Sequence, residues 1–317
     1  MGHPAVTRTY NWAKIRPQSM QARQISRTAE YMAFFRALES VHRCRQRLIT
    51  DPFATSFLRP SLRVAVRLSR IPLLRTLIER YADRRLPGAR TSAVARTRLI
   101  DEACTRALRD GVHQIVILGA GFDCRAYRLP EAACAKIFEV DHPQMLALKA
   151  TCLRKFLSAI PGNVHYAAID FNLQSLHQVL ADASFDSSLP AMFIWEGVTN
   201  YLNQDAVDAV LRYIGNCSPD SRIVFTYVHR GVLDGSVQFE GGARIVRDVA
   251  GIGEPWTFGF DPVTLPEFLD ERNLRIDYDA GAQEYRLQFY GSGSAHMRGY
   301  DFYHVVIAHV PGENFRR

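Results

Sequence analysis

Three absences narrow the classes of protein to which this sequence can belong. No apolar run reaches the roughly eighteen residues of a membrane-spanning helix, so no membrane span is expected. Residues 1–18 are polar and lack the apolar segment of a secretory signal, which favours a cytoplasmic protein. The six cysteines include no C-x-x-C pair, a pattern typical of reduced thiols rather than of disulfides or zinc ligands.

Lysine is also scarce, because nearly all of the 39 basic residues are arginine. Residues 1–110 hold 22 basic and 8 acidic residues, whereas residues 111–317 hold 17 and 24. A basic segment of this kind can meet an anionic substrate, nucleic acid or the acidic part of the same chain. Because the chain has no lysine-rich tail and no known nucleic-acid motif, pairing with a substrate or within the molecule is favoured.

The apolar periodicity predicts an α/β protein with a doubly wound sheet and a helical cap. Residues 1–110 are expected to form an N-terminal arm (1–20) and the cap, and residues 111–317 the core. Cap helices are expected from Ser26, after Asp51-Pro52, and over 61–70, 73–84 and 92–109. Core strands are expected over 114–118, 136–141, 164–170, 191–196, 222–227, 275–278 and 302–310. Core helices are expected over 143–159, 176–181, 205–217, 243–250 and 264–273. A lid-like insertion or loop is expected around 231–300, with a hairpin-like loop or lid at 283–299.

The central motif is the strand 114–118, which runs directly into Gly119-Ala120-Gly121. A strand that ends in a Gly-x-Gly turn is typical of doubly wound sheets that bind nucleotide-like ligands. A dinucleotide fingerprint would have a third glycine where this chain has Cys124. Asp123 also places a carboxylate where a pyrophosphate needs bare N–H groups. The loop therefore favours S-adenosylmethionine over NAD, with a tight turn that binds nothing as the alternative.

Acidic residues follow three further strands, where ligands of open α/β sheets bind. They are Asp141, Asp170 and Glu196. Asp141 lies 20 residues after Gly121, the usual offset for a carboxylate that binds ribose hydroxyls. Each acid alone could equally be a helix cap. Arg96 or Arg98 could hold a ligand carboxylate, or be an ordinary surface arginine.

A series of motifs occurs in order along residues 26–230. They are Arg-Thr-Ala-Glu-Tyr (27–31), Asp-Pro-Phe-Ala (51–54), Ala-Arg-Thr-Arg (95–98) with Ile100-Asp101, Ile-Leu-Gly-Ala-Gly-Phe-Asp-Cys-Arg (117–125), Glu-Val-Asp-His-Pro (139–143) with Lys149, and Trp-Glu-Gly-Val (195–198) with Tyr201-Leu202. Together they resemble the leucine carboxyl methyltransferase family of S-adenosylmethionine-dependent methyltransferases. This family includes phosphatase methyltransferases and polyketide O-methyltransferases of the tetracenomycin type.

The resemblance implies a seven-stranded Rossmann-like sheet with an antiparallel last pair, and it assigns roles to individual residues. It implies cofactor-binding roles for Arg96, Gly119, Ala120, Gly121, Asp123, Asp141, His142, Asp170, Phe171 and Glu196, and catalytic roles for Tyr201 and Arg27. Arg96 would hold the cofactor carboxylate, Asp141 the ribose, and Glu196 would lie near the ammonium group. Asp170 and Phe171 would lie by the adenine, and Tyr201 near the methyl group or substrate. No metal is implied. Family members commonly have Thr or Ser where this chain has Cys124.

The favoured function is methylation of a carboxylate on a small organic acid, in secondary metabolism. A carboxylate is already ionised at neutral pH and needs no base, and an arginine-rich cap suits it. A phenol or alcohol acceptor would need a base, for which His142, His165, His229 and His304 are available. A protein C-terminus is another possible acceptor, and a cofactor-binding, nucleic-acid-associated protein is the non-enzymatic alternative. The expected partner is an anionic, aromatic or lipophilic small molecule, with no membrane partner. The aromatic residues of the cap (Tyr31, Phe34, Phe35, Phe53 and Phe57) and the segment 285–290 suggest such an acceptor, unless they are core.

Overall fold

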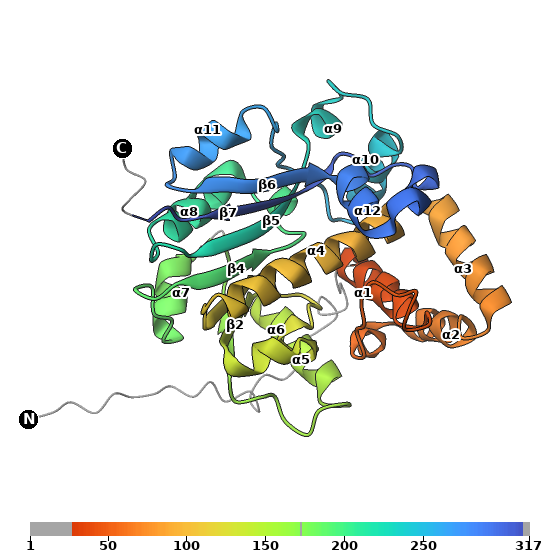
Figure 1. Cartoon of the computed structure of the whole chain (residues 1–317), viewed down its shortest axis with the longest axis horizontal. Helices are drawn as coiled ribbons and strands as arrows, with labels where there is room; N and C mark the ends of the chain where they lie inside the picture. Colours follow the sequence, from red (N-terminus) through yellow and green to blue (C-terminus); the bar gives the residue numbers. More distant parts are fainter. Residues whose placement is uncertain (1–26, 172, 313–317) are drawn as a thin grey trace, which may run out of the picture.

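The computed structural model describes residues 27–171 and 173–312, which form a central sheet with helices on both faces (Figure 1). Its strands are β1 (Gln114–Leu118), β2 (Lys136–Asp141), β3 (Val164–Ala168), β4 (Ala191–Trp195), β5 (Arg222–Val228), β6 (Arg275–Gly281) and β7 (Tyr303–His309). The strand order is β3-β2-β1-β4-β5-β7-β6. Strands β1 to β5 are parallel, and β7 runs antiparallel to β5 and β6. The predicted doubly wound sheet with an antiparallel last pair is therefore confirmed.

Helices precede the sheet and then alternate with its strands, as the periodicity predicts. Before β1 they are α1 (Arg27–Glu39), the 3₁₀ helix η3 (Ala54–Phe57), α2 (Pro60–Leu68), α3 (Pro72–Arg85) and α4 (Ala89–Arg109). After β1 they are α5 (Arg125–Arg128), η4 (Pro130–Cys134), α6 (Pro143–Leu153), α7 (Leu176–Asp182), η5 (Thr199–Tyr201), α8 (Gln204–Gly215), α9 (Arg230–Asp234), α10 (Gly242–Gly251), α11 (Leu265–Asp270), α12 (Ala282–Tyr290) and η6 (Gly291–His296). Among the described residues, no helix has the length and apolarity needed to cross a bilayer.

The strands β1 and β4 are buried on both faces, because a helical layer packs on each side of the sheet. On one face α7, α8 and α11 pack against side chains such as Phe193 and Phe225. On the other face α4 and α12 pack against side chains such as Ile117 and Ile194. The central strands therefore read as continuous apolar runs, which is why they are easy to recognise in the sequence.

The cap is built from α1, η3 and α2, and it packs directly on the glycine loop after β1. Phe57 stacks on Phe122 with ring centroids 4.5 Å apart. The Arg36 guanidinium donates to the carbonyl of Phe122 (2.6 Å) and to the carboxylate of Asp51 (2.8 Å). Helix α4, which the sequence also places in the cap, packs with its first turns (Ala89 and Ala93) in the apolar cluster of the cap and with the rest of its length along the sheet (Figure 1).

The predicted loop at residues 283–299 is wrong, because this stretch is α12 followed by η6. Tyr285 is fully buried, bonds to the hydroxyl of Ser92 on α4 at 2.6 Å, and donates to the carbonyl of Tyr303. Its burial with Ala282 and Arg286 gives α12 one inward face, which a short helix shows too weakly in sequence. Residues 275–290 thus complete the sheet and its helical layer.

Two smaller differences concern helix ends. Helix α6 ends at Leu153 and not near residue 159; Phe156, just beyond its end, is 55% exposed. The arm predicted for residues 1–20, and Ser26, lie outside the described residues. Asp51 accepts from the backbone N–H groups of Phe53 and Ala54 (both 3.0 Å), so the predicted cap exists but begins the 3₁₀ helix η3.

Candidate cofactor-binding and active site

The loop after β1 needs glycine at two positions for different reasons. Gly119 (φ 63°) and Gly121 (φ 39°) both have left-handed backbone conformations. A β-carbon on Gly119 would lie 2.3 Å from a methyl carbon of Val198, so this glycine lets the loop pack against the segment after β4. Among the described residues, a β-carbon on Gly121 would have only the Gly119 carbonyl oxygen nearby, at 3.7 Å. The second glycine therefore leaves an open stretch of backbone that a ligand can approach.

Asp141 lies beside this loop, as its spacing from Gly121 predicts. Its carboxylate accepts from the backbone N–H groups of Gly121 and His142, both at 2.6 Å. Burial raises the pKa of Asp141 above its usual value, and these two hydrogen bonds oppose that shift. His142 is exposed and caps α6, with its Nδ1 accepting from the Gln144 N–H. The end of β2 is thereby tied to the loop after β1.

Glu196, just after β4, lies between two buried arginines. Its Oε1 accepts from Nε of Arg96, and its Oε2 from Nη1 of Arg125, both at 2.8 Å. Burial opposes ionisation, but Arg125 and Arg96 outweigh it and hold the pKa of Glu196 at about 2. Arg96 is 3% exposed and its guanidinium carbon lies 4.6 Å from the ring centroid of Tyr303. Opposite charges thus lie side by side at this edge of the sheet.

Arg125 connects three carboxylates, although it was not among the predicted site residues. Besides Glu196 it donates to Asp123 and, through Nε, to Asp101 at 2.8 Å. Although burial opposes ionisation, Arg125 lowers the pKa of Asp123. The Asp123 charge is therefore compensated by its own neighbour instead of facing a ligand alone. Arg125 and Asp101 both occur in the family motifs, and this was the feature of the sequence that could have identified them as site residues.

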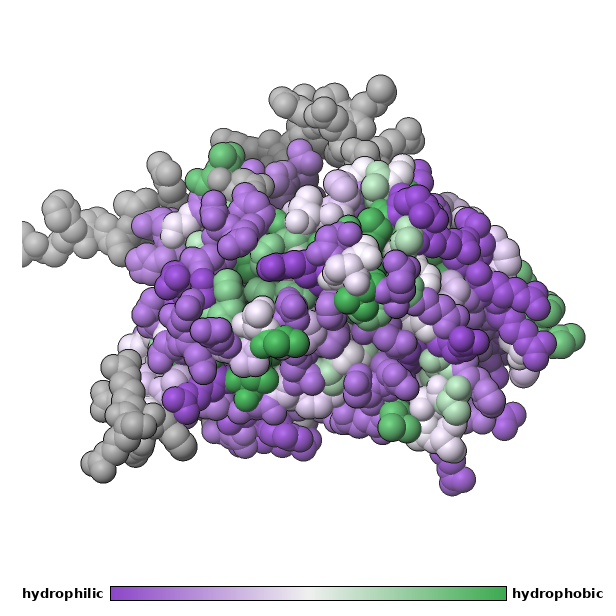
Figure 2. Space-filling view, turned by 90° about the horizontal axis from the view of Figure 1, so that it is seen from above, coloured by the Kyte–Doolittle hydropathy of each residue, from purple (hydrophilic) through white to green (hydrophobic). Residues whose placement is uncertain are grey.

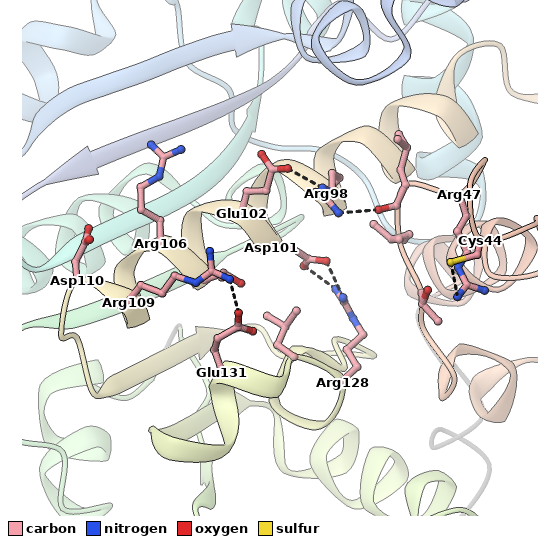
Figure 3. A pocket seen from close by; sticks show the side chains of 15 residues that line it. Cys44, Arg47, Arg98, Asp101, Glu102, Arg106, Arg109, Asp110, Arg128 and Glu131 are labelled. Atoms are coloured by element: carbon pink, nitrogen blue, oxygen red, sulfur yellow. Dashed lines mark hydrogen bonds and ion pairs between the residues drawn. The ribbon is translucent and has the colours of Figure 1, made fainter.

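A hollow of about 770 Å³ borders this network between α4, the segment 44–50 and the start of η4 (Figure 3). Asp101 and Arg128 line it, and Arg128 donates to both Asp101 oxygens at 2.6 Å. Arg98, one of the two arginines considered for a ligand carboxylate, lines this hollow, but none of the other predicted site residues does, all of which are described. It is therefore separate from the ends of β1, β2 and β4.

The end of β3 brings a further acid to the same edge. The N–H of Ile169 donates to the carbonyl of Asp141 at 3.0 Å, so Asp170 follows immediately beyond the β2–β3 pairing. The backbone N–H of Asp170 donates to the side chain of Gln174 at 3.0 Å. Phe171 packs partly against the apolar cluster on the α7 and α8 face. The four predicted strand ends therefore lie together, as the sequence requires.

Tyr201 and Arg27 are brought to one place although they are far apart in sequence. The phenol of Tyr201 lies beside the hydroxyl of Thr28, and burial raises the pKa of Tyr201. The carboxylate of Glu254 accepts from the N–H of Arg27 (2.9 Å) and from the N–H and hydroxyl of Thr28. A glutamate from a distant loop thus fixes the start of α1, where Arg27 is exposed.

Three aromatic residues next to this place were not predicted as site residues. Tyr303 stacks with Tyr300 at a centroid distance of 6.0 Å, and Trp256 lies 6.4 Å from Tyr303. By contrast, of the cap rings that suggested a lipophilic ligand, Phe34, Phe35 and Phe57 are buried core residues, and Tyr31 and Phe53 are half-buried against the same cluster. The aromatic surface near Tyr201 comes from the last third of the chain, whose sequence pattern is loose.

This edge fits S-adenosylmethionine. Gly121 offers open backbone, Asp141 a carboxylate next to it, and the Arg96–Glu196 pair the two charges that a free α-amino acid group would meet. When bound, the cofactor supplies a methyl group carried by a positively charged sulfur. The individual binding roles of these residues remain predictions from the motifs.

Comparison with known proteins decides the family. The leucine carboxyl methyltransferase family model matches residues 29–215. The chain belongs to the leucine carboxyl methyltransferase family. A Streptomyces coelicolor protein assigned by name to the S-adenosyl-L-methionine-dependent methyltransferases is 35% identical over 68% of this chain and 72% of its own length. A Mycobacterium bovis protein of the same designation is 32% identical over 82% of this chain and 73% of its own.

The fold agrees with this assignment. One solved structure with this fold is a crystal structure of a Thermobifida fusca protein that is named as a methyltransferase. It superimposes with a TM-score of 0.58 over 88% of this chain and 94% of its own chain, at 18% sequence identity. This leucine carboxyl methyltransferase family member is thus an S-adenosylmethionine-dependent methyltransferase with a Rossmann-like sheet and N-terminal helices.

Proposed function

We propose that this methyltransferase acts on the carboxylate of a small organic acid and produces a methyl ester. The observation that carries the proposal is the exposed side chain of Arg27, the residue that directly precedes Thr28, whose hydroxyl lies beside the phenol of Tyr201. Arginine suits recognition of a carboxylate, because its planar guanidinium matches the two oxygens. An ionised carboxylate already holds the electron pair that accepts a methyl group, so the protein has only to align it and exclude water.

The aromatic surface of Trp256, Tyr300 and Tyr303 favours an acid with a planar or lipophilic body. The family takes its name from carboxyl methylation, which also supports a carboxyl acceptor. A small acid is favoured over a protein C-terminus because the aromatic residues are largely buried, with Trp256 9% and Tyr303 5% exposed.

The experiment incubates the protein with methyl-labelled S-adenosylmethionine and a panel of aromatic and lipophilic acids, phenols and alcohols. We expect labelled product from acids, and loss of the label as methanol after mild alkaline hydrolysis, because esters hydrolyse and ethers do not. Arg27→Gln should raise KM for the acid by roughly tenfold while the Kd for the cofactor stays unchanged. Arg43→Gln, an exposed arginine beyond α1, is the matched control. An alkali-stable product would contradict the carboxyl proposal.

A hydroxyl acceptor is the second candidate, and the His304 group favours it. Tyr227 donates to Asp279 at 2.9 Å, and Nδ1 of His304 lies 3.0 Å from Asp279. Since an ionised carboxylate only accepts, Nδ1 of His304 carries the proton and Nε2 is left with a lone pair. Nδ1 of His229 and Nδ1 of His142 instead accept backbone N–H groups.

The two candidates differ in the effect of His304→Gln. If a phenol or alcohol is the acceptor, this substitution should lower kcat by roughly a hundredfold and remove the fall in kcat on the acid side of the pH profile, because a general base acts only when it is deprotonated. If a carboxylate is the acceptor, kcat should change less than about threefold and the pH profile should keep its shape.

A further inference from the structure

The α2–α3 hairpin (residues 60–85) has large apolar side chains that are exposed in the described part of the structure. They are Val64 (51% exposed), Leu68 (45%), Ile71 (54%), Leu73 (71%), Leu77 (53%) and Tyr81 (68%). No side chain of α3 is buried. Figure 1 shows the hairpin at the end of the molecule away from the sheet, and Figure 2 shows apolar atoms standing among hydrophilic ones at that end.

The same hairpin carries a positive charge that its surroundings do not neutralise. Its arginines are Arg63, Arg67, Arg70, Arg75, Arg80, Arg84 and Arg85, and all but the half-buried Arg75 are exposed. Its two acids are engaged elsewhere: Glu79 contacts His42 at 2.6 Å and Asp83 pairs with Arg90 at 2.7 Å. Within the described part of the chain, no hairpin arginine forms a salt bridge.

The apolar and basic groups of α3 lie on one side of the helix. Leu73, Leu77 and Tyr81 follow one another at intervals of four residues, and Arg80 and Arg84 lie along the same stripe. An arginine can keep its guanidinium at a polar surface while its apolar stem and the neighbouring leucines enter an apolar layer. This combination is the one found in helices that lie in the interface of a lipid bilayer.

We propose that the α2–α3 hairpin docks on an anionic lipid surface, with its leucines in the acyl boundary and its arginines at the phosphate groups. A second copy of the chain is a poorer occupant, because a symmetric contact would bring the same unneutralised arginines together. Nucleic acid would meet the charge but leave the leucines in water. The sequence alone predicts no membrane partner, because it has no apolar run long enough to span a bilayer, whereas a helix that lies on a lipid surface needs no such run.

Docking in this way would bring the Asp83–Arg90 pair, which joins α3 to α4, near the lipid together with the start of α4. Arg90, the partner of Asp83, lies in the first turn of α4, the helix that also carries Arg96. A lipophilic acceptor could then reach the site from the membrane. The docking itself does not depend on which acceptor is methylated.

The test is co-flotation of the full chain with phosphatidylcholine vesicles and with phosphatidylcholine–phosphatidylglycerol vesicles. We expect binding to the anionic vesicles that is at least about tenfold stronger than to the neutral ones and falls steeply with added salt. Leu73→Ser with Leu77→Ser should weaken it by roughly tenfold or more. Val263→Ser with Leu189→Ser, which also removes exposed apolar residues, should leave it unchanged.

A second comparison of two double variants tests the contribution of charge to vesicle binding separately from that of apolar contact. Arg80→Gln with Arg84→Gln should weaken anionic binding, whereas Arg244→Gln with Arg247→Gln on α10 should not. Thermal unfolding of each variant shows that it is folded. Equal binding to neutral and anionic vesicles, or equal binding by the hairpin and control variants, would overturn the proposal. So would dimerisation in sedimentation velocity that requires Leu73 and Leu77 without vesicle binding, or salt-sensitive binding to DNA alone.

Discussion

Arginine has two different environments in this protein, at the edge of the sheet and on the α2–α3 hairpin. At the edge Arg96 and Arg125 are each 3% exposed and have carboxylate partners at 2.8 Å. On the hairpin Arg80 and Arg84 are exposed and have no salt bridge among the described residues. A charge that is removed from water needs a partner, so the buried arginines at the edge pair with carboxylates and stabilise the structure around the predicted ligand site. The second group keeps its hydration and remains available for an external surface.

The largest expected effect comes from Arg125→Met. It would leave Asp101, Asp123 and Glu196 with less compensation in a buried place, so we expect a loss of about 3–5 kcal/mol in the free energy of unfolding. Urea denaturation measures it. Arg80→Met on the hairpin is the matched control and should change the same quantity by less than about 0.5 kcal/mol. Similar losses of unfolding free energy in both variants would contradict the difference between the two arginine environments.

Acid should weaken the edge of the sheet selectively. The pKa of Glu196 is about 2 in the folded protein against an ordinary value of 4.5. A lowered pKa stabilises the fold above the ordinary value, and this stability is lost as the pH falls from 4.5 towards 2. The contribution is on the order of 3 kcal/mol.

Comparison of wild type with Glu196→Gln at about pH 6 and about pH 3 tests this, because the variant lacks the titrating group. The difference in unfolding free energy should be smaller at the lower pH. Glu102→Gln, in an exposed pair with Arg98, should show no such change. A constant difference for Glu196→Gln would contradict the low pKa.

The ligand role of the edge is tested by Asp141→Asn. If Asp141 holds the ribose, the affinity for S-adenosylmethionine measured by calorimetry should fall by roughly 10–100-fold, since a hydrogen bond to a charged group is lost. Asp182→Asn, at the exposed end of α7, should bind as wild type does. Unchanged affinity in Asp141→Asn would remove this role.

The smallest effect is expected at the Asp83–Arg90 pair, which joins the α2–α3 hairpin to α4. Asp83 pairs with Arg90 but its side chain is 38% exposed, so Asp83→Asn should cost at most about 1 kcal/mol. Because this pair ties α3 to α4, trypsin should cut the hairpin arginines faster in the variant. Asp248→Asn, which breaks an exposed pair on α10, is the control and should leave the cleavage rate unchanged.

Much of the fold was predictable because its signals are local. Continuous apolar runs identify β1 and β4, and proline and glycine mark several helix ends. Helix α12 was missed because only Ala282, Tyr285 and Arg286 face inward, which is too short a periodic pattern to separate from a loop. The acids at the strand ends were predictable in the same way, since parallel strands bring their carboxyl ends to one edge.

The sequence by itself determined the type and order of the elements and the edge of the sheet where the site lies. Periodicity and glycine spacing carry that information within a few residues. Only the tertiary structure decided which charges meet: Arg125 with Glu196, Asp83 with Arg90, and Glu254 with the start of α1. It also decided which arginines stay exposed, because burial depends on segments that are distant along the chain.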